Sequence, residues 1–584
     1  MINNVICGIN GPVVTVKNTK SFSMQEMVYV GNEGLIGEVI GINDEQTLIQ
    51  VYEETTGLKC GEPVKPTGEA MSVILGPGIL SNIYDGIARP LRVIEKDSGA
   101  FIGRGSSAGA LDKNKKWNVT VTTAVGDVLN QGETYATCPE TDCITHKCMV
   151  PFGISGEVVF AAPDGEYCVD DKIIVLKKAD GSEETLTLCQ KWPIRTPRPI
   201  AERLLSDIPL ITGQRVIDTV MPIAKGGTAA IPGGFGTGKT MTQHQLAKWC
   251  DADIIIYVGC GERGNEMTQV LDEFGELIDP RSGKKLTDRT VLIANTSNMP
   301  VSAREASIYT GITLAEYYRD MGYDVAMMAD STSRWAEALR EISGRLEEMP
   351  AEEGFPAYLP SRLSAFYERA GRVRTLCGDS GSVTVIGAVS PQGADFSEPV
   401  TQNTKRFTRV FWALDKSLAY ARHYPAINWM TGYSEYEADL ADYYNSEVDP
   451  EFMEYRRKLI NILREESSLM EIVKLIGADV LPDDQRLTID IARVIRVGFL
   501  QQNAYHPEDT YVPLKKQFYM MKVIIYLYEQ AKRLISNSVP VAGLVNSGIY
   551  EKLIKMKYEV PNNNLKILDS YFTEIDKIIA SLLT

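Results

Sequence analysis

A glycine-rich run of eight residues narrows the choice of fold for this chain more than any other part of its sequence. It consists of Gly233, Gly234, Phe235, Gly236, Thr237, Gly238, Lys239 and Thr240. The run fits the pattern G-x-x-x-x-G-K-[ST] at every specified position. Glycines here allow backbone conformations that turn successive N–H groups toward a phosphate, and the lysine can reach the β- and γ-phosphates. The run therefore predicts a nucleotide-binding P-loop.

The residues around the P-loop predict its structural context. An apolar run at 228–231 precedes the loop, and a helical stretch from Thr240 to about Trp249 follows it. Further apolar runs alternate with helical stretches, at 254–258, 291–294, 325–329 and 383–389. Strands that are apolar throughout and separated by helices are typical of a parallel sheet covered on both faces. We therefore expect an α/β nucleotide-binding core, in which the helix after the loop presents its N-terminus to the phosphates.

Two acidic residues after predicted strands complete a candidate hydrolytic site. Thr240 offers a hydroxyl ligand for Mg²⁺, and Asp330, directly after the strand 325–329, offers a carboxylate. Glu262 follows the strand 254–258 at the carboxyl edge of the sheet, where ligands of open α/β folds bind. An acid there can orient and polarise the attacking water. Taken alone, Asp330 could also be a helix cap or turn residue, and Glu262 a surface-loop acid.

The chain divides into segments of different composition. Residues 1–70 alternate apolar and polar positions between turn signals, which predicts an N-terminal β-barrel, and 71–110 is a glycine-rich connection. Residues 111–190 are β-leaning and turn-rich, which indicates an inserted domain. A proline-rich stretch marks the start of the P-loop domain, 191–430, and a helical pattern extends over 431–584. The expected fold class is thus multidomain α/β with a barrel, an insert, a RecA-like core and a helical C-terminal domain.

The C-terminal segment has a predicted helix boundary and a predicted buried face. Asp449 and Pro450 indicate a helix start, and Gly477 indicates a helix end. A stripe with 4-3-4-3 spacing comprises Leu514, Phe518, Met521, Ile525 and Tyr528. We expect this stripe to be core or subunit interface rather than a ligand site.

The charge balance and the lack of long apolar runs exclude several classes of protein. The 584 residues contain 60 Lys and Arg against 76 Asp and Glu, a formal net charge of −16. A general binder of nucleic-acid backbone needs clustered Lys and Arg, so this acidity argues against one. No run reaches the roughly 18 apolar residues of a membrane helix, and the N-terminal residues lack the pattern of a secretory signal. The ten cysteines predict reduced thiols in a cytosol rather than a disulfide framework.

Five segments of this sequence occur together, in the same order, in one known family. They are PGILSNIYDG at 77–86, the P-loop, GERGNE at 261–266, ADSTSRWAEA at 329–338 and YPAINW at 424–429. Along essentially its whole length the chain resembles the catalytic A subunit of the V/A-type rotary ATPases, of the bacterial or archaeal type. The segment 111–190 then corresponds to the bulge domain that separates this subunit from the shorter F-type catalytic subunit. Thr237 stands where eukaryotic members carry a cysteine, so thiol-based locking of the P-loop is not expected.

The resemblance implies roles for individual residues. Glu262 corresponds to the glutamate that activates the hydrolytic water, and Arg263 beside it to a phosphate contact. Tyr424 and Tyr505 correspond to residues that lie against the adenine, as an aromatic face can, although each could also be ordinary packing at a domain junction. The chain lacks an arginine finger for its own γ-phosphate, and in the family the neighbouring B subunit supplies one in trans. We therefore expect the isolated chain to be a feeble ATPase.

The resemblance also implies a reaction and an assembly. The enzyme hydrolyses or synthesises ATP, bound with Mg²⁺, and couples this to proton or sodium-ion transport across a membrane. The implied partners are B subunits in an alternating hetero-hexamer, a central rotor stalk, peripheral stalk subunits and a membrane ion-translocating sector. The chain is expected at the cytoplasmic face of the membrane, as a peripheral protein without a transmembrane segment or signal peptide.

Two other functions compete with this one. A non-catalytic nucleotide-binding subunit of the same assembly would share the fold, but it would not need Lys239, Glu262 and Asp330 together. A hexameric P-loop nucleic-acid translocase could share the core, but it should show a basic or aromatic strand-binding surface. Because this chain is acidic, no nucleic-acid partner is expected.

One cysteine-rich segment raises the question of a metal site. Cys138, Cys143, His146 and Cys148 could in principle supply the thiolate and imidazole ligands of zinc. Their spacing is not the usual pair of C-x₂₋₄-C arms, and the family is not marked by such a site. No zinc is therefore expected.

Overall fold

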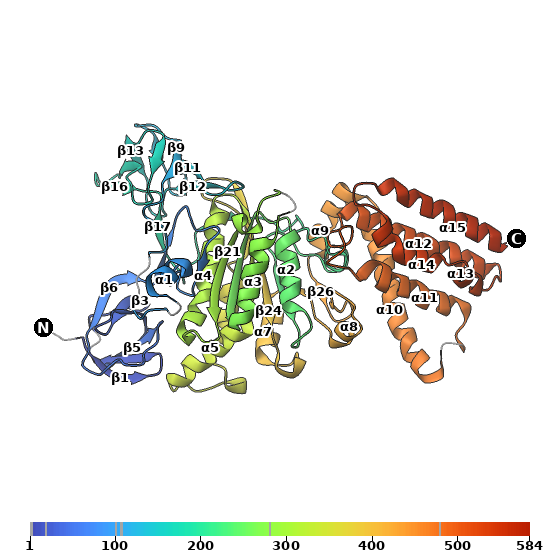
Figure 1. Cartoon of the computed structure of the whole chain (residues 1–584), viewed down its shortest axis with the longest axis horizontal. Coiled ribbons are helices and arrows are strands. Elements are labelled where there is room, and N and C mark those ends of the chain that lie inside the picture. Colours follow the sequence, from blue (N-terminus) through green and yellow to red (C-terminus); the bar gives the residue numbers. More distant parts are fainter. Residues whose placement is uncertain are drawn as a thin grey trace. The chain divides into compact units, whose positions relative to one another are not determined.

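The chain folds into two compact units. The computed structural model describes residues 4–17, 20–99, 102–105, 109–279, 282–477 and 480–583, so parts of the expected 71–110 connection (100–101 and 106–108) lie outside the described residues. Unit 1 comprises Met1–Leu205, Gly226–Thr228 and Ala252–Thr408, and unit 2 comprises Ser206–Lys225, Ala229–Asp251 and Arg409–Thr584. Figure 1 shows the elements of both units.

The N-terminal part of unit 1 is an antiparallel barrel. Its strands are β1 (Ile6–Asn10), β2 (Val13–Lys17), β3 (Glu26–Val30), β4 (Leu35–Ile42), β5 (Gln46–Val51) and β6 (Val64–Ala70). They pair in the order β1-β2-β5-β4-β3-β6. The sheet closes on itself because Val64 N donates to Asn4 O at 2.8 Å and Ile6 N donates to Glu62 O at 2.9 Å. Alternate apolar residues of these strands, Val14, Val28 and Ile49 among them, fill the interior, which confirms the predicted barrel.

The inserted segment is an all-β body of two small sheets. One sheet has the order β10-β13-β15-β16 and the other β12-β11-β9-β14. The strands are β9 (Trp117–Val121), β10 (Val128–Leu129), β11 (Thr134–Pro139), β12 (Thr145–Met149), β13 (Gly156–Ala161), β14 (Gly165–Tyr167), β15 (Ile174–Lys177) and β16 (Glu183–Leu186). The chain enters through β7 (Ser72–Leu75), passes α1 (Leu91–Ser98), and leaves through β17 (Gln190–Pro193), which pairs with β7. The β-rich insert is thus confirmed.

The central sheet of unit 1 is parallel, as predicted. Its order is β24-β22-β20-β21-β8. The strands are β8 (Ile83–Tyr84), β20 (Ile254–Glu262), β21 (Thr290–Thr296), β22 (Asp324–Asp330) and β24 (Ser380–Val389), and β18 (Glu202–Arg203) and β23 (Gly371–Arg374) add an antiparallel edge. Strands β20, β21, β22 and β24 are buried along nearly their whole length. That burial explains why their sequences are apolar without alternation.

Helices cover both faces of this sheet. The helices are α3 (Gly264–Glu276), α4 (Val301–Asp320), α5 (Thr332–Arg345), α6 (Leu359–Tyr367) and α7 (Pro399–Phe407). The step from β20 to β21 and the step from β21 to β22 run in opposite directions along the sheet. Because such crossovers are right-handed, α3 lies on one face and α4 on the other, as Figure 1 shows. Helix α5 packs beside α4.

The insert is held to α4 and to the turn after it by polar contacts, most of them buried. Glu140 of the insert accepts hydrogen bonds from the hydroxyl of Tyr318 at 2.9 and 3.1 Å. Beside it, His146 Nε2 lies 3.0 Å from the Tyr317 hydroxyl. Just after α4, the hydroxyl of Tyr323 donates to Thr145 O at 2.7 Å. The insert and the sheet-covering helix are therefore joined as parts of one unit.

Unit 2 contains the P-loop and the C-terminal helices. Its strands pair in the order β26-β25-β19, and the P-loop connects β19 to α2. The strands are β19 (Thr228–Pro232), β25 (Val410–Phe411) and β26 (Tyr433–Ser434), and the helices around them are α2 (Lys239–Trp249), α8 (Lys416–Tyr420) and α9 (Glu437–Tyr443). The C-terminal helices are α10 (Phe452–Ile476), α11 (Asp483–Val494), α12 (Leu514–Ser536), α13 (Ala542–Asn546), α14 (Ile549–Glu559) and α15 (Leu568–Leu583), which lie together in Figure 1.

The predicted details of the helical segment are partly right. The stripe from Leu514 to Tyr528 lies on α12 with every member buried, and α10 ends at Gly477 as expected. The helix start at Asp449 is wrong, because α10 begins at Phe452. Asp449 instead accepts a hydrogen bond from Glu451 N at 2.9 Å, which stabilises a turn before the helix.

Arg195 joins the barrel to the parallel sheet's covering helix within unit 1. Its guanidinium donates two hydrogen bonds of 2.8 Å to Glu38 of β4 and bonds of 2.8 and 3.0 Å to Glu305 of α4. The Tyr52 hydroxyl also donates to Glu38. The side chains of Glu38 and Glu305 are only 1% and 4% exposed, so each depends on the arginine for charge balance.

We predict that Arg195→Met lowers the free energy of unfolding of unit 1 by about 3–5 kcal/mol, because it leaves two buried carboxylates unpaired. Urea unfolding, followed by hydrogen exchange at amides of β4 and α4, measures the loss. The matched control is Lys191→Ala, which breaks the exposed Lys191–Glu69 pair and should cost less than about 1 kcal/mol. Equal, small losses in the two variants would contradict the expectation.

Candidate active site

The P-loop of unit 2 has the backbone that its glycines predict. Gly236 and Gly238 have φ angles of 78° and 91°, in the left-handed region that favours glycine. Gly238 is the residue before α2, which begins at Lys239. The loop therefore leads directly into the N-terminus of an eleven-residue helix, where backbone N–H groups and the helix dipole favour an anion.

Hydrogen bonds within the P-loop hold its shape. Lys239 Nζ donates to Gly233 O at 2.8 Å and to Gly234 O at 3.1 Å. The Thr237 hydroxyl also donates to Gly234 O, at 2.8 Å. A Cβ at Gly233 would lie 2.6 Å from the Thr237 hydroxyl and 2.8 Å from Leu414 Cβ, so a larger residue would force this part of the loop to shift. The ammonium group of Lys239 is thus kept on the inner side of the loop.

A cavity of about 790 Å³ begins beside the P-loop in unit 2. Gly238, Met241, Thr242 and Gln245 of the P-loop and α2 form one wall. The other walls are Gln214, Ile217, Arg422, Tyr424, Pro425, Tyr558 and the loop 501–505. The size and largely apolar character suit a small organic ligand such as a nucleoside. Both tyrosines that the sequence singled out, Tyr424 and Tyr505, line this cavity.

The two tyrosines differ in solvent exposure. Tyr505 is 88% exposed and Tyr424 45% exposed, so each residue has exposed surface available for stacking. Tyr424 also lies near the phosphate loop, since a Cβ on Gly238 would be 4.0 Å from its ring. The cavity therefore extends from a phosphate-binding helix end to two exposed aromatic rings.

Glu262 and Asp330 come together in unit 1. Glu262 is the last residue of β20 and Asp330 the last residue of β22, and these neighbouring parallel strands pair Gly259 with Asp330. Asp330 is 2% exposed, and the Tyr257 hydroxyl donates to it at 3.1 Å. Both carboxyl groups thus lie at the carboxyl edge of the sheet, as predicted. Arg263 follows Glu262 as an exposed residue at the start of α3.

The surroundings of Glu262 make its carboxyl unusually basic. Burial, the charge of Asp330 and contact with Glu266 raise the pKa of Glu262 to about 9, while Arg334 acts in the opposite direction. A carboxyl with this pKa accepts a proton much more readily than an ordinary glutamate does. Such shifts are typical of catalytic acids and bases.

Several residues of these sites were missed in the sequence. Glu266 lies in the first turn of α3, four residues after Glu262 and within the segment 261–266, and Arg334 lies inside the segment 329–338. Met241 and Gln245 face the cavity one and two turns into α2. No local pattern marks Tyr558, which reaches the cavity from α14.

The predicted site residues therefore form two groups, one on each unit. The P-loop, including Lys239 and Thr240, lies with Tyr424 and Tyr505 on unit 2. Glu262, Arg263 and Asp330 lie on unit 1. Thr240 offers a hydroxyl oxygen in unit 2 and Asp330 a carboxylate oxygen in unit 1, and each taken by itself is a hard donor of the kind that Mg²⁺ takes.

The cysteine-rich segment of the insert has structural roles. His146 is buried, with Nδ1 3.0 Å from Glu140 and Nε2 3.0 Å from the Tyr317 hydroxyl, so both ring nitrogens are engaged. Cys138 and Cys148 are buried, whereas Cys143 is exposed. Within the part of the chain that is described, no group of three or more His, Cys, Asp or Glu side chains is arranged to hold a metal ion.

Comparison with known families agrees with this architecture. The nucleotide-binding domain of the ATP synthase alpha/beta family matches residues 213–434, and the beta-barrel domain of that family matches 6–68. The alpha/beta subunit barrel-sandwich domain matches 108–195, and the C-terminal domain of V and A type ATP synthase matches 441–543. The exact domain boundaries that we expect from the sequence remain predictions.

Individual relatives are similar over nearly their whole length. The V-type ATP synthase alpha chain 2 of Clostridium tetani is 59% identical over 577 residues, which cover 98% of this chain and 97% of the relative. The V-type ATP synthase alpha chain of Halothermothrix orenii is 58% identical over 97% of this chain and 97% of its own length. The corresponding A-type ATP synthase chain of Methanopyrus kandleri is 57% identical over 97% of this chain and 96% of its own length. This chain belongs to the alpha-chain family of V- and A-type ATP synthases.

Membership of the alpha-chain family confirms the enzyme class that the sequence predicted, an ATP hydrolase or synthase. The nucleic-acid translocase is correspondingly disfavoured. A solved secretion ATPase, EscN of enteropathogenic Escherichia coli, shares the fold with a TM-score of 0.63, over 89% of this chain and 99% of its own, at 20% identity. Among the described helices of this alpha-family protein, none has the length and apolarity that crossing a bilayer requires.

We predict that Tyr505→Ala weakens MgADP binding to this protein by about 1–3 kcal/mol, because it removes a stacking surface for the base. Titration calorimetry with the full chain measures the change. Tyr505→Phe retains the ring and should bind as the wild type does. Tyr420→Ala is the control, since Tyr420 is 85% exposed but lies outside the cavity. Equal losses for Tyr420→Ala and Tyr505→Ala would refute the stacking role.

Proposed function

We propose that this chain is the catalytic subunit of an ion-translocating rotary ATPase, which hydrolyses or synthesises MgATP. The observation that carries the proposal is the completeness of its chemistry. One chain holds an intact P-loop with its lysine, an aromatic-lined cavity beside it, and the Glu262–Asp330 pair at the ends of two neighbouring strands. A non-catalytic relative would not need all three.

Different residues of this chain bind the phosphates, the base and the metal ion. Lys239 and the N-terminus of α2 bind and neutralise the phosphates, which stabilises the charge that develops during phosphoryl transfer. Tyr424 and Tyr505 hold the base. Thr240 and Asp330 are the residues that would hold Mg²⁺, an ion that screens the phosphate charge when bound.

Glu262 activates the attacking water in this mechanism. Its carboxyl orients the attacking water and takes its proton, and in the synthetic direction it returns that proton. Because burial and neighbouring acids raise the pKa of Glu262 to about 9, the carboxyl can accept a proton only when nearby positive charge favours its ionised form, and Arg334 supplies one such charge. Arg263, exposed beside it, contacts the γ-phosphate.

The positive charge that this chain does not itself supply to the γ-phosphate comes from a partner subunit. We propose that a B subunit donates an arginine finger in trans, which can raise the rate by roughly 10³ to 10⁵. The assembly is then an alternating hetero-hexamer with a central rotor stalk and peripheral stalks. Its membrane sector transports protons or sodium ions, and this chain works at the cytoplasmic face of that membrane.

We predict that Glu262→Gln in the assembled complex keeps nucleotide binding but lowers ATP turnover by at least about a hundredfold, because an amide cannot accept the proton. A coupled ADP-release assay and nucleotide titration measure the two properties. Glu276→Gln, an exposed change at the far end of helix α3, which follows Glu262, should leave both properties unchanged. Normal turnover by the Glu262→Gln complex would overturn the assignment.

A further inference from the structure

The loop 501–505 is held by an unusually dense set of buried polar contacts. It supplies five lining residues of the cavity and follows the helical segment Ile495–Leu500, which continues α11. Gln502 N donates to Tyr424 O at 2.8 Å, so the backbone of the loop is tied to one of the cavity's tyrosines. Asn503 N donates to Asp509 at 2.7 Å. Any shift of this loop therefore moves the walls that face the ligand.

Arg215 anchors the loop from one side. The arginine is fully buried and pairs with Asp509 at 2.6 Å. It also donates to Phe499 O and, at 2.9 Å, to Gln501 O. These carbonyls lie at the end of a helical segment, where they lack partners inside the helix and attract a cation.

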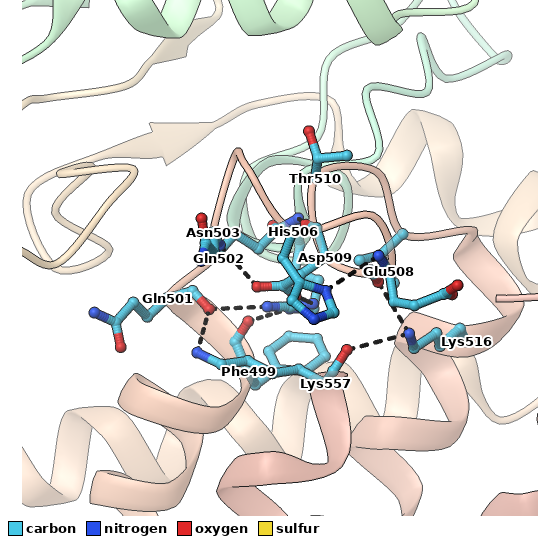
Figure 2. A network of polar contacts seen from close by, with 12 residues as sticks. Phe499, Gln501, Gln502, Asn503, His506, Glu508, Asp509, Thr510, Lys516 and Lys557 are labelled. Carbon is cyan, nitrogen blue, oxygen red and sulfur yellow. Dashed lines mark hydrogen bonds and ion pairs between the residues drawn. The ribbon is translucent and has the colours of Figure 1, made fainter. Parts of the chain in front are cut away.

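Lys557 of α14 anchors the same carbonyl from the other side. Its ammonium group donates to Val497 O at 2.7 Å and to Gln501 O at 3.1 Å, and the side chain is only 2% exposed. Figure 2 shows Lys557, Phe499 and Gln501 converging below the loop. The next residue, Tyr558, lines the cavity, and its ring centroid lies 4.6 Å from that of His506.

Burying Lys557 is costly, which points to a specific role. Burial lowers its pKa to about 8, with Arg215 adding to the effect and Asp509 opposing it. The cost of burying the ammonium group is offset by the carbonyl oxygens that accept its hydrogen bonds. One of them belongs to Gln501, the first residue of the cavity loop.

We propose that Lys557 is a positioning residue for the base end of the nucleotide, which fixes the 501–505 loop through Gln501 O. It thereby links helix α14 of the C-terminal bundle to base binding. The proposal rests on the proposed function, in which this cavity takes the base and the P-loop takes the phosphates.

The variant Lys557→Met separates this role from a general loss of structure. It keeps the length of the side chain but removes the donor to Gln501 O. We expect the Kd of the full chain for MgADP to rise about tenfold, the effect of losing one charged hydrogen bond at the loop. The Kd for inorganic tripolyphosphate, which has no base, should stay within about twofold. In the assembled complex, KM for ATP should rise while kcat changes little.

Two lysines serve as matched controls. Lys516 of α12 is equally buried, but its ammonium group donates to Val560 O, Asn562, Glu508 O and, at 3.4 Å, to the backbone carbonyl of Lys557, and to none of residues 497–505. Lys516→Met should lower the melting temperature without changing the ratio of the two Kd values. Lys555→Met, an exposed change on α14, should alter neither property. The positioning role is overturned if Lys557→Met weakens both ligands equally, or if Lys516→Met shifts the ratio as much.

Hydrogen exchange of the wild-type chain tests the same link without depending on whether a variant folds. MgADP should slow amide exchange in 501–505 and in the last turn of α14, whereas tripolyphosphate should slow exchange in the P-loop alone. Protection of 501–505 by MgADP without any change in α14 would overturn the link through Lys557 but leave the proposed function intact. No protection of 501–505 by MgADP would overturn both.

Discussion

Phosphate binding by backbone N–H groups is the constraint on which the rest of this structure depends. Such groups can converge only if the backbone enters the left-handed region, and Gly236 and Gly238 do so at the entrance to α2. Once α2 is fixed by this turn, Met241 and Gln245 on its side become a wall of the adjoining cavity. The same loop thus determines where the phosphates lie and where a base can lie relative to them.

Much of the fold could be predicted because the local patterns agree with the final packing. Runs that are apolar throughout became the buried strands β20, β21, β22 and β24, and the Gly-x-x-x-x-Gly-Lys-Thr spacing gave the loop. The predicted start of α10 was wrong because an Asp side chain can accept a backbone hydrogen bond in a turn as well as at a helix N-terminus. The structure shows that Asp449 accepts from Glu451 N, in the turn before the helix. At Asp449 and Pro450 the chain makes a turn, and α10 begins two residues later, at Phe452.

The candidate site was predicted in part, and the missing part is long-range. Glu262, Asp330 and Tyr424 stand in recognisable segments, whereas Tyr505 was expected only from the resemblance, and the structure places both tyrosines at one cavity. Arg215 and Lys557 are separated by more than half the chain and meet at Gln501 O only after folding. Their lysine and arginine side chains give no local signal, because an isolated basic residue is ordinarily a solvated surface charge.

The fastening of the inserted domain to α4 has a mechanical consequence. Glu140, His146 and Thr145 bind tyrosines on and just after the helix that covers the strands bearing Glu262 and Asp330. Since these contacts are mostly buried and the helix is packed along its length, the insert has little freedom to swing on its own. A load applied to the surface of the insert would therefore reach α4, and through it the strands that bear Glu262 and Asp330, with little movement at the junction.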